Sequence, residues 1–160
     1  MPVSPSDLLA RCRQNGQRLA TAESCTGGLI AARLTDVAGS SDVFERGFVT
    51  YSNEAKTEML GVPVTLLARV GAVSEEVARA MAEGAIARSR ADFAIAVTGI
   101  AGPGGGTPAK PVGLVHIACA RRDSWTVHER HVFPGDRAAV RAATVEAALA
   151  LILRQIEAPG

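Results

Sequence analysis

Residues 19–37 constrain the fold of this chain more than any other segment. A short apolar run, residues 19–23, breaks at Ser24 into a hydroxyl-rich turn that ends in two glycines. Residues 28–37 then carry apolar side chains at helical spacing. This order predicts a strand, a tight turn and a helix, the basic unit of α/β proteins. The turn would hold the Ser24 hydroxyl and several backbone N–H groups at the positive end of a helix, where a developing anion is stabilised.

The composition is typical of a globular protein. The chain has 160 residues, of which 48% are hydrophobic and 21% charged, so we expect one domain, residues 1–160, with a sizeable core. The formal net charge is +1, no block of like charges occurs, and the few aromatic residues are spread from Phe44 to Phe133. These features argue against a nucleic-acid partner and against an anionic membrane surface. A homo-oligomer is compatible with the sequence.

The amino terminus and the cysteines indicate the cellular compartment of the protein. Residues 1–7 lack the basic and apolar regions of a signal peptide, and no run approaches the roughly 18 apolar residues that a membrane span requires. Cys12, Cys25 and Cys119 are odd in number and irregularly spaced, which fits neither a disulfide framework nor a zinc site. We therefore expect a cytoplasmic protein with reduced thiols. We expect no cofactor.

Helical and extended patterns alternate along most of the chain. Helices are predicted at 4–13, 28–37, 52–60, 63–70, 74–90 and from 135 onward. Strands are predicted at 18–23, 44–51, 93–97, 112–120 and 124–133, the last two as an antiparallel hairpin. The pattern indicates a single-domain α/β fold, a three-layer α/β/α sandwich with a mixed sheet. Ligands bind such sheets at the carboxyl ends of strands, where the turns at Ser24, Tyr51 and Thr98 can converge.

Ser24 is the candidate nucleophile. A strand–helix turn without catalytic function would also use Ser, Thr and Gly, because these residues are common in turns. The pattern is not Gly-x-Ser-x-Gly, so the nucleophile elbow of α/β-hydrolases does not apply. Cys25 is a rival nucleophile, since a helix amino terminus lowers the pKa of a thiol, although a buried structural cysteine is the commoner outcome.

The basic residues indicate a candidate base. All of them are Arg except Lys56 and Lys110. Arginine stays protonated, whereas burial can lower the pKa of a lysine until the amine accepts a proton. Tyr51 and Lys56 lie at the second strand–helix junction, and Lys56 falls in the first helical turn if Asn53 is the cap. A neutral Lys56 could take the Ser24 proton directly or through the Tyr51 hydroxyl. The alternative is a solvated lysine beside a core tyrosine.

The segment 98–107 is a candidate substrate-binding loop. It is dense in glycine but matches neither a Walker A loop nor a dinucleotide fingerprint. We expect a backbone cradle or a loop that encloses the substrate, with a merely flexible connection as the alternative. The candidate binding residues in this segment are Thr98, Gly99, Gly102, Gly104 and Gly105.

Arg137 and Arg141 stand one turn apart at the start of the last predicted helix. Cations are unfavourable there unless an anion is bound, so the pair suggests a phosphate or carboxylate site. A salt bridge to Asp136 or Glu129 is the structural alternative. The three histidines, His116, His128 and His131, show no metal-ligand pattern and are not expected to be catalytic, with His128 and His131 on opposite faces of one strand.

Taken together, these segments resemble the carboxy-terminal domain family of the competence-damage-inducible protein CinA, whose stand-alone members include nicotinamide mononucleotide amidohydrolases. The resemblance covers nearly the whole chain. It is carried by residues 21–28 (Thr-Ala-Glu-Ser-Cys-Thr-Gly-Gly), 51–56 (Tyr-Ser-Asn-Glu-Ala-Lys), 71–74, 97–105, 110–113 and 133–137, with Arg141. The large amino-terminal domain of fused CinA proteins has no counterpart here, so we expect none of its activity.

The resemblance implies a reaction and its catalytic residues. The reaction is hydrolysis of the carboxamide of nicotinamide mononucleotide to nicotinic acid mononucleotide and ammonia, without a metal. A serine nucleophile assisted by tyrosine and lysine is implied at Ser24, Tyr51 and Lys56. We expect Lys56 to deprotonate Ser24 with Tyr51 as relay, and backbone N–H groups to hold the oxyanion, with these candidates: Thr26, Gly27 and Gly28.

Three questions stay open at the level of sequence. The 5′-phosphate of the substrate could bind Arg137, Arg141 or the backbone of residues 102–106. A non-catalytic nucleotide- or partner-binding module would use the same glycine turns and arginines. A serine or cysteine amidase acting on another small carboxamide is a further alternative.

Overall fold

The structure, a computed structural model, describes residues 2–159. The elements follow in this order: α1 (Pro5–Asn15), β1 (Leu19–Glu23), α2 (Leu29–Thr35), the 3₁₀ turn η1 (Ser40–Asp42), β2 (Phe44–Val49), α3 (Asn53–Leu60), α4 (Val64–Val70), α5 (Glu75–Ala87), β3 (Phe93–Gly99), β4 (Leu114–Arg121), β5 (Thr126–Val132) and α6 (Arg137–Glu157). The alternation of strands and helices predicted from hydrophobic periodicity is confirmed.

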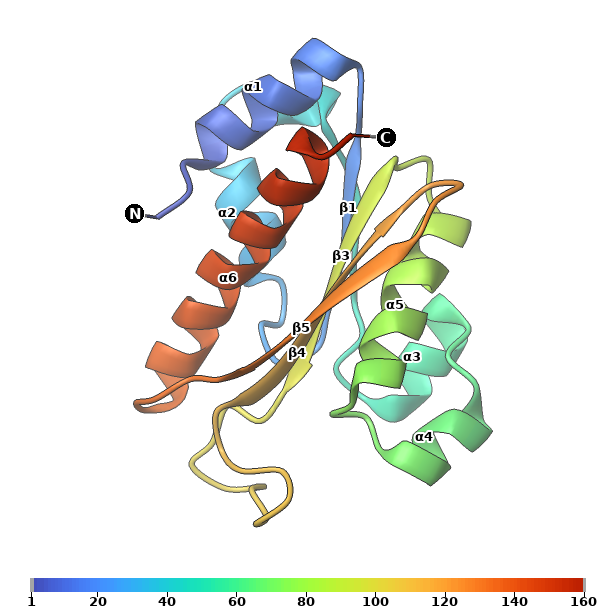
Figure 1. The fold of residues 1–160 in the computed structure, drawn as a ribbon, viewed down its shortest axis with the longest axis vertical. Coiled ribbons are helices and arrows are strands. Elements are labelled where there is room, and N and C mark those ends of the chain that lie inside the picture. The colour runs from blue at the N-terminus through green and yellow to red at the C-terminus, as the bar shows by residue number, and fades with distance from the viewer. Residues whose placement is uncertain (1, 160) are drawn as a thin grey trace.

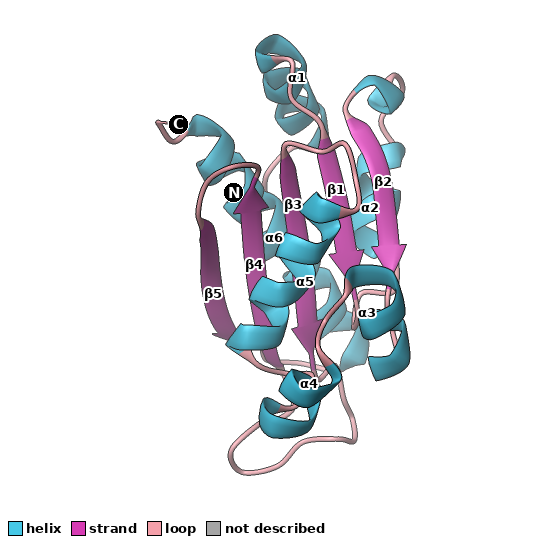
Figure 2. Cartoon of the chain, turned by 90° about the vertical axis from the view of Figure 1, so that its right-hand side faces the viewer, coloured by secondary structure: helices cyan, strands magenta, loops and turns pink. Residues whose placement is uncertain are grey.

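The strands form one mixed five-stranded sheet in the order β2-β1-β3-β4-β5. Strands β1, β2 and β3 are parallel, whereas β4 is antiparallel to both β3 and β5 (Figure 2). The predicted hairpin is therefore confirmed. Glu23 at the end of β1 pairs with Val49 of β2 on one side and with Val97 of β3 on the other. All three parallel strands thus end at the same edge of the sheet.

Helices cover both faces of this sheet. One layer contains α1, α2 and α6 and the other contains α3, α4 and α5 (Figure 1). Alternation along the central strands serves both layers: Ile95 and Val97 belong to the core beneath α6, and Ala94 and Ala96 to the core beneath α5. The expected three-layer α/β/α sandwich is confirmed.

A glycine in the last turn of α5 permits close packing against the end of α3. A Cβ atom added to Gly84 would lie 2.0 Å from the carbonyl oxygen of Leu60. No side chain fits at that distance, so the contact requires glycine despite its low helix propensity. Because Lys56 belongs to the same helix as Leu60, this contact also fixes the position of Lys56.

The element boundaries differ from prediction by a few residues. Strand β3 continues through Gly99, so Thr98 and Gly99 are strand residues rather than the start of a loop. Helix α3 is capped by Ser52, whose Oγ accepts from the Ala55 N–H, and not by Asn53. Other ends shift: Pro63 precedes α4, α5 stops at Ala87, β4 begins at Leu114, and β5 covers Thr126–Val132.

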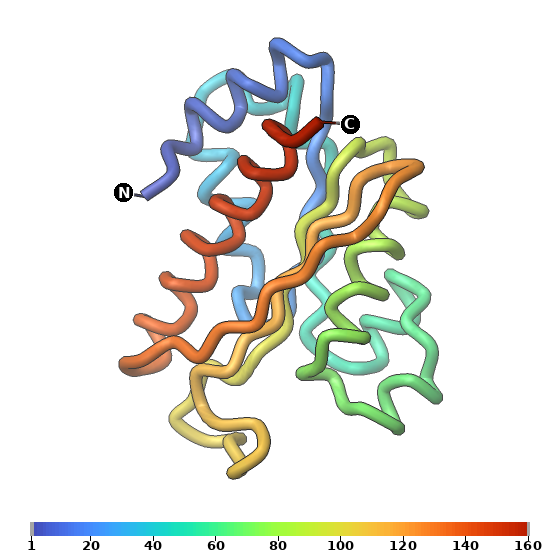
Figure 3. The backbone as a smooth tube through the Cα atoms, viewed as in Figure 1, coloured from blue at the N-terminus to red at the C-terminus, as the bar shows by residue number. Residues whose placement is uncertain are grey.

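The segment between β3 and β4 projects beyond the sheet at the edge where the parallel strands end (Figure 3). Its Gly102, Gly105 and Gly113 have positive φ angles, which favour glycine at these three positions. Among residues 2–159, no helix combines the length and apolar character needed to cross a membrane.

Candidate active site

Ser24 lies directly after β1, where the chain leaves the sheet. Its N–H donates to the Val97 carbonyl of β3 at 3.1 Å, which ties the residue to the central strand. Gly27 and Gly28 then turn the chain into α2 with φ angles of 57° and 108°. Residues with a Cβ rarely adopt such angles, so the double glycine is a requirement of this turn. The Ser24 side chain is 9% exposed.

Glu23 is a residue of the turn whose function the sequence did not reveal. Its carboxylate is fully buried and accepts from the Thr26 hydroxyl at 2.7 Å and from the N–H groups of Ile30 and Ala31 at 2.8 and 3.1 Å. Gly28, the residue at the amino-terminal cap of α2, supplies no side-chain cap. Glu23 replaces it. The expectation of free N–H groups at this helix end is therefore wrong, because a carboxylate already occupies them.

Lys56 projects from the first turns of α3 into the interior and is 1% exposed. Its Nζ lies 2.9 Å from Ser24 Oγ, 2.9 Å from the Thr50 carbonyl oxygen and 3.3 Å from that of Tyr51. Burial lowers the pKa of this amine below the ordinary lysine value. The predicted proximity of Ser24 and Lys56 is confirmed, and the alternative of a solvated lysine is excluded.

The three contacts of Lys56 can be made by the ammonium, whose three N–H groups would donate to all three oxygens, and equally by the neutral amine. A neutral amine has two N–H donors, which the Thr50 and Tyr51 carbonyls can accept, and one lone pair, which can accept the Ser24 O–H. In the described part of the chain, Lys56 forms no ion pair with a carboxylate that would favour the ammonium form. The arrangement therefore suits a general base aimed at the serine hydroxyl.

Tyr51 occupies the rim of the site rather than the space between serine and lysine. Its side chain is 60% exposed, and its hydroxyl accepts from Arg137 Nη2 at 3.0 Å. Only the main-chain carbonyl of Tyr51 contacts Lys56. The structure thus favours the direct Lys56–Ser24 arrangement over a relay through the Tyr51 hydroxyl, because the lysine already contacts the serine.

The two arginines of α6 have different surroundings. Arg137 connects Tyr51 with the segment that follows β3, since Nη1 donates to the Gly102 carbonyl at 2.8 Å while Nη2 donates to the Tyr51 hydroxyl. Arg141 instead donates to the carbonyls of Cys25 and Thr26, both at 3.1 Å. The alternative of a salt bridge to Asp136 or Glu129 is wrong for both arginines: Asp136 caps α6, and Glu129 pairs with Arg154 and His131.

A cavity of about 300 Å³ opens above the Ser24–Lys56 pair. Most of the predicted site residues line it, namely Ser24, Tyr51, Lys56, Thr98, Gly99, Gly102, Gly104, Gly105 and Arg137. Four predicted residues do not: Thr26, Gly27, Gly28 and Arg141. The Gly27 N–H is also engaged, because it donates to the Ser24 carbonyl at 3.0 Å. Of the turn beyond Ser24, only Cys25 lines the cavity, so the oxyanion donors expected at residues 26–28 lie outside its lining.

Cys25 is a poor rival to Ser24 as nucleophile. Burial raises the pKa of its thiol to about 11, so the reactive thiolate is scarce at neutral pH. The pKa of this thiol is not lowered as expected, because burial outweighs the lowering effect of the neighbouring Arg141 and Lys56, and the Glu23 carboxylate raises it slightly further. The neutral side chain packs with the apolar core on the α2–α6 side of the sheet.

Comparison with known proteins places these residues in a family. The model of the CinA C-terminal domain matches residues 4–156. The chain belongs to this family. Its CinA domain is 49% identical to the competence/damage inducible protein of Agrobacterium tumefaciens, whose crystal structure superposes with a TM-score of 0.90 over 99% of this chain and 98% of that one. A CinA-superfamily protein from Escherichia coli is 40% identical, with a TM-score of 0.90 over 94% and 87% of the two chains.

The curated relatives are longer proteins. A CinA-like protein of Akkermansia muciniphila is 60% identical over 146 residues, which are 91% of this chain but 35% of that protein. A CinA-like protein of Citrifermentans bemidjiense is 58% identical over 90% of this chain and 34% of its own length. The present CinA domain thus spans about a third of the curated relatives that it matches.

The three histidines of this CinA domain lie outside the cavity. His116 Nδ1 and His128 Nε2 are 2.9 Å apart on the α5 side of the sheet, and Glu75 stands 3.7 Å from His128. His131 stacks on Phe133 on the opposite face, as the strand alternation predicted. Within residues 2–159, no group of three or more His, Cys, Asp or Glu side chains is arranged to hold a metal ion.

Proposed function

We propose that this CinA domain hydrolyses the carboxamide of nicotinamide mononucleotide, giving nicotinic acid mononucleotide and ammonia. One observation carries the catalytic part of the proposal: a buried lysine without a carboxylate partner contacts a serine hydroxyl at 2.9 Å, at the floor of a cavity. Serine–lysine pairs activate the serine as a nucleophile for acyl transfer. The family resemblance of residues 21–28 and 51–56 supplies the substrate.

In the first half of the reaction, neutral Lys56 takes the proton of Ser24 as its oxygen attacks the amide carbonyl carbon. The resulting tetrahedral intermediate collapses when the protonated Lys56 returns a proton to the leaving nitrogen. The C–N bond breaks, ammonia departs, and the acyl group is left as an ester on Ser24. The Thr50 and Tyr51 carbonyls stabilise the transient ammonium of Lys56 by accepting its hydrogen bonds.

In the second half, water attacks the ester carbonyl with Lys56 again as base. The Ser24–acyl bond breaks and the proton held by Lys56 returns to Ser24, which restores the enzyme. The oxyanion of both intermediates needs N–H donors in the cavity. The backbone N–H of Cys25 is the natural candidate, because this residue follows the nucleophile and lines the cavity.

The remaining wall of the cavity suits the nucleotide part of the substrate. Arg137 lines it and offers a guanidinium whose present acceptors are two neutral oxygens, those of Gly102 and Tyr51. A phosphate would be a stronger acceptor for this group. Gly104 and Gly105 bring backbone to the same wall without side chains. Arg141 lies outside the cavity, so of the two arginines we assign the phosphate to Arg137.

The acyl-enzyme tests this proposal directly. Purified protein mixed with nicotinamide mononucleotide and quenched in acid within milliseconds to seconds should carry the acyl group on the peptide that contains Ser24, as seen by mass spectrometry. The Ser24→Ala variant should carry none. An adduct on Cys25, or turnover without an adduct on either residue, would contradict the mechanism. Correctly folded protein that neither reacts nor turns over would favour a nucleotide- or partner-binding module instead.

A further inference from the structure

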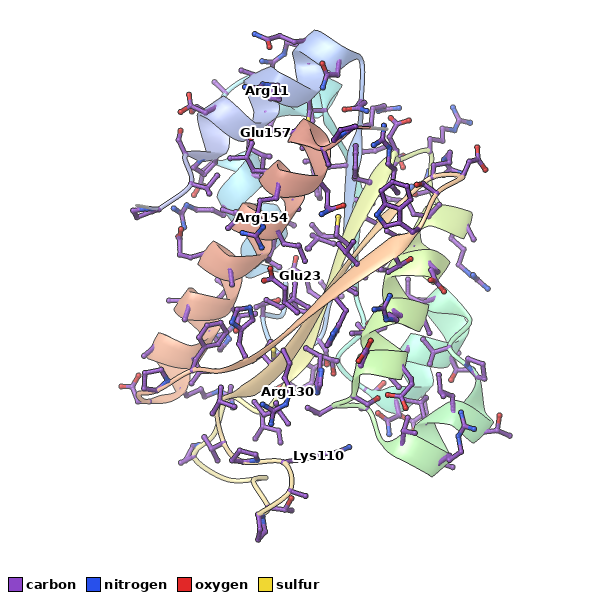
Figure 4. All side chains as sticks on the ribbon, in the orientation of Figure 1. Arg11, Glu23, Lys110, Arg130, Arg154 and Glu157 are labelled. Atoms are coloured by element: carbon purple, nitrogen blue, oxygen red, sulfur yellow. The ribbon has the colours of Figure 1, made fainter. Side chains whose placement is uncertain are left out.

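We propose that Glu23 is a positioning residue that fixes both members of the Ser24–Lys56 pair, an inference that rests on the proposed function. The Glu23 side chain lies in the interior, on the side of the sheet that α2 and α6 cover (Figure 4). It contacts neither the cavity nor the reacting atoms. Its effect on catalysis must therefore pass through the residues that it holds.

The side chain of Glu23 spans the turn that presents the nucleophile. It reaches from the last residue of β1 across Ser24 to Thr26 and to the first N–H groups of α2. Both ends of the Ser24 turn are thus attached to one carboxylate. Displacement of a reacting group by about 1 Å can cost on the order of 100-fold in rate, so this attachment matters for the attack angle of Ser24.

The main chain of Glu23 holds the base. Its carbonyl accepts from the Thr50 N–H at 2.9 Å, and the Thr50 carbonyl in turn accepts from Lys56 Nζ at 2.9 Å. The residue that precedes the nucleophile is therefore one hydrogen bond away from the residue that orients the amine. Through Glu23, a shift of the turn would also displace Lys56.

A helix cap alone would not require a buried carboxylate. Helices α1, α3, α5 and α6 use a side chain at the cap position itself: Ser4, Ser52, Ser74 and Asp136. Burying a carboxylate is costly, and among residues 2–159 Glu23 has no ion-pair partner to offset it. Two helices have no side chain that caps from that position: α4, which follows Pro63, and α2, whose cap position is Gly28, which the turn requires. In α2, the Glu23 carboxylate extends past Ser24 and caps the helix instead.

Two variants and one control test the assignment. Glu23→Gln keeps the shape of the side chain but replaces one acceptor oxygen by an NH₂ group that faces an N–H donor. We expect kcat to fall about 10- to 100-fold with KM within about twofold. Thr26→Val removes only the hydroxyl contact, and we expect kcat to fall about threefold. Ser4→Ala removes a helix cap far from the site and should lower Tm without changing kcat.

A second readout does not depend on the substrate. The rate at which phenylmethylsulfonyl fluoride modifies Ser24, followed by intact mass, should fall in parallel with kcat in both Glu23→Gln and Thr26→Val. Wild-type kcat and wild-type sulfonylation in Glu23→Gln would overturn the inference; if that variant does not fold, the same result in Thr26→Val would overturn it. Wild-type protein that shows neither ammonia release nor sulfonylation would overturn the proposed function together with this inference.

Discussion

The Nζ atom of Lys56 lies 2.9 Å from the hydroxyl oxygen of Ser24, with no other side chain between them. The two residues come from different strand–helix junctions, β1–α2 and β2–α3, and the parallel pairing of β1 with β2 brings these junctions to one edge of the sheet. The contact exists because Lys56 is buried under Thr50 and Tyr51 rather than extended into solvent. The catalytic argument depends on this relationship.

Lys56→Met should abolish turnover and change how stability depends on pH. Since burial lowers the pKa of Lys56, the unfolded chain binds this proton at pH values where the folded protein has released it. The free energy of unfolding of wild type should therefore rise with pH relative to the variant, by at most about 1.4 kcal/mol per pH unit, between the folded and unfolded pKa values. Urea unfolding from pH 6 to 10 measures this difference.

Lys110→Met is the matched control for that experiment. The Lys110 amine donates to the Val70 carbonyl and does not line the cavity of Ser24. The variant should keep turnover. Equal loss of turnover in both variants would contradict a specific function for Lys56.

Tyr51→Phe and Arg137→Ala should affect binding more than chemistry. The Tyr51 hydroxyl contacts Arg137 rather than Lys56 or Ser24, so its loss should leave kcat within about threefold of wild type. Removal of the Arg137 guanidinium should raise KM about 10- to 100-fold if it binds the substrate phosphate. Steady-state kinetics separate the two effects. A fall of kcat by a factor of 100 in Tyr51→Phe would instead support a proton relay through the Tyr51 hydroxyl.

Much of this site was predictable from sequence because its residues mark strand ends. Ser24 and Tyr51 follow predicted strands directly, and Lys56 stands out among arginines, so parallel pairing alone was expected to bring them together. The carboxylate of Glu23 was not predictable, since a Glu at a strand end gives no sign of the direction in which its side chain points. For the same reason, the sequence did not show that the Glu23 carboxylate accepts from the N–H groups of Ile30 and Ala31 at the start of α2.

Acid should destabilise the protein through His116. Burial, followed by the neighbouring His128, lowers the pKa of His116 to about 4. Between pH 6.5 and 4 the unfolded chain therefore binds a proton that the folded protein does not. As the pH is lowered through this range, the free energy of unfolding should fall by up to about 1.4 kcal/mol per pH unit. Urea unfolding should show a smaller slope over this window in His116→Leu. An unchanged slope would contradict the argument.

Gly84→Ala should destabilise the fold even though alanine favours helices. The added Cβ would lie 2.0 Å from the Leu60 carbonyl oxygen, and α5 and α3 would have to separate. Overpacking costs about 1–3 kcal/mol, more than the roughly 1 kcal/mol gained in helix propensity. Thermal unfolding measures the net change as a lower Tm. Gly104→Ala, where nothing lies within 4 Å, should leave Tm nearly unchanged, and a stabilised Gly84→Ala would disprove the close contact.

Ammonia release from nicotinamide mononucleotide tests the central claim most directly. Wild type and Cys25→Ala should release ammonia from the nucleotide but not from free nicotinamide, because the phosphoribosyl group contributes binding at Arg137. Ser24→Ala, folded as judged by circular dichroism, should release none above background. Ammonia release by Ser24→Ala at a rate near that of wild type would contradict the account.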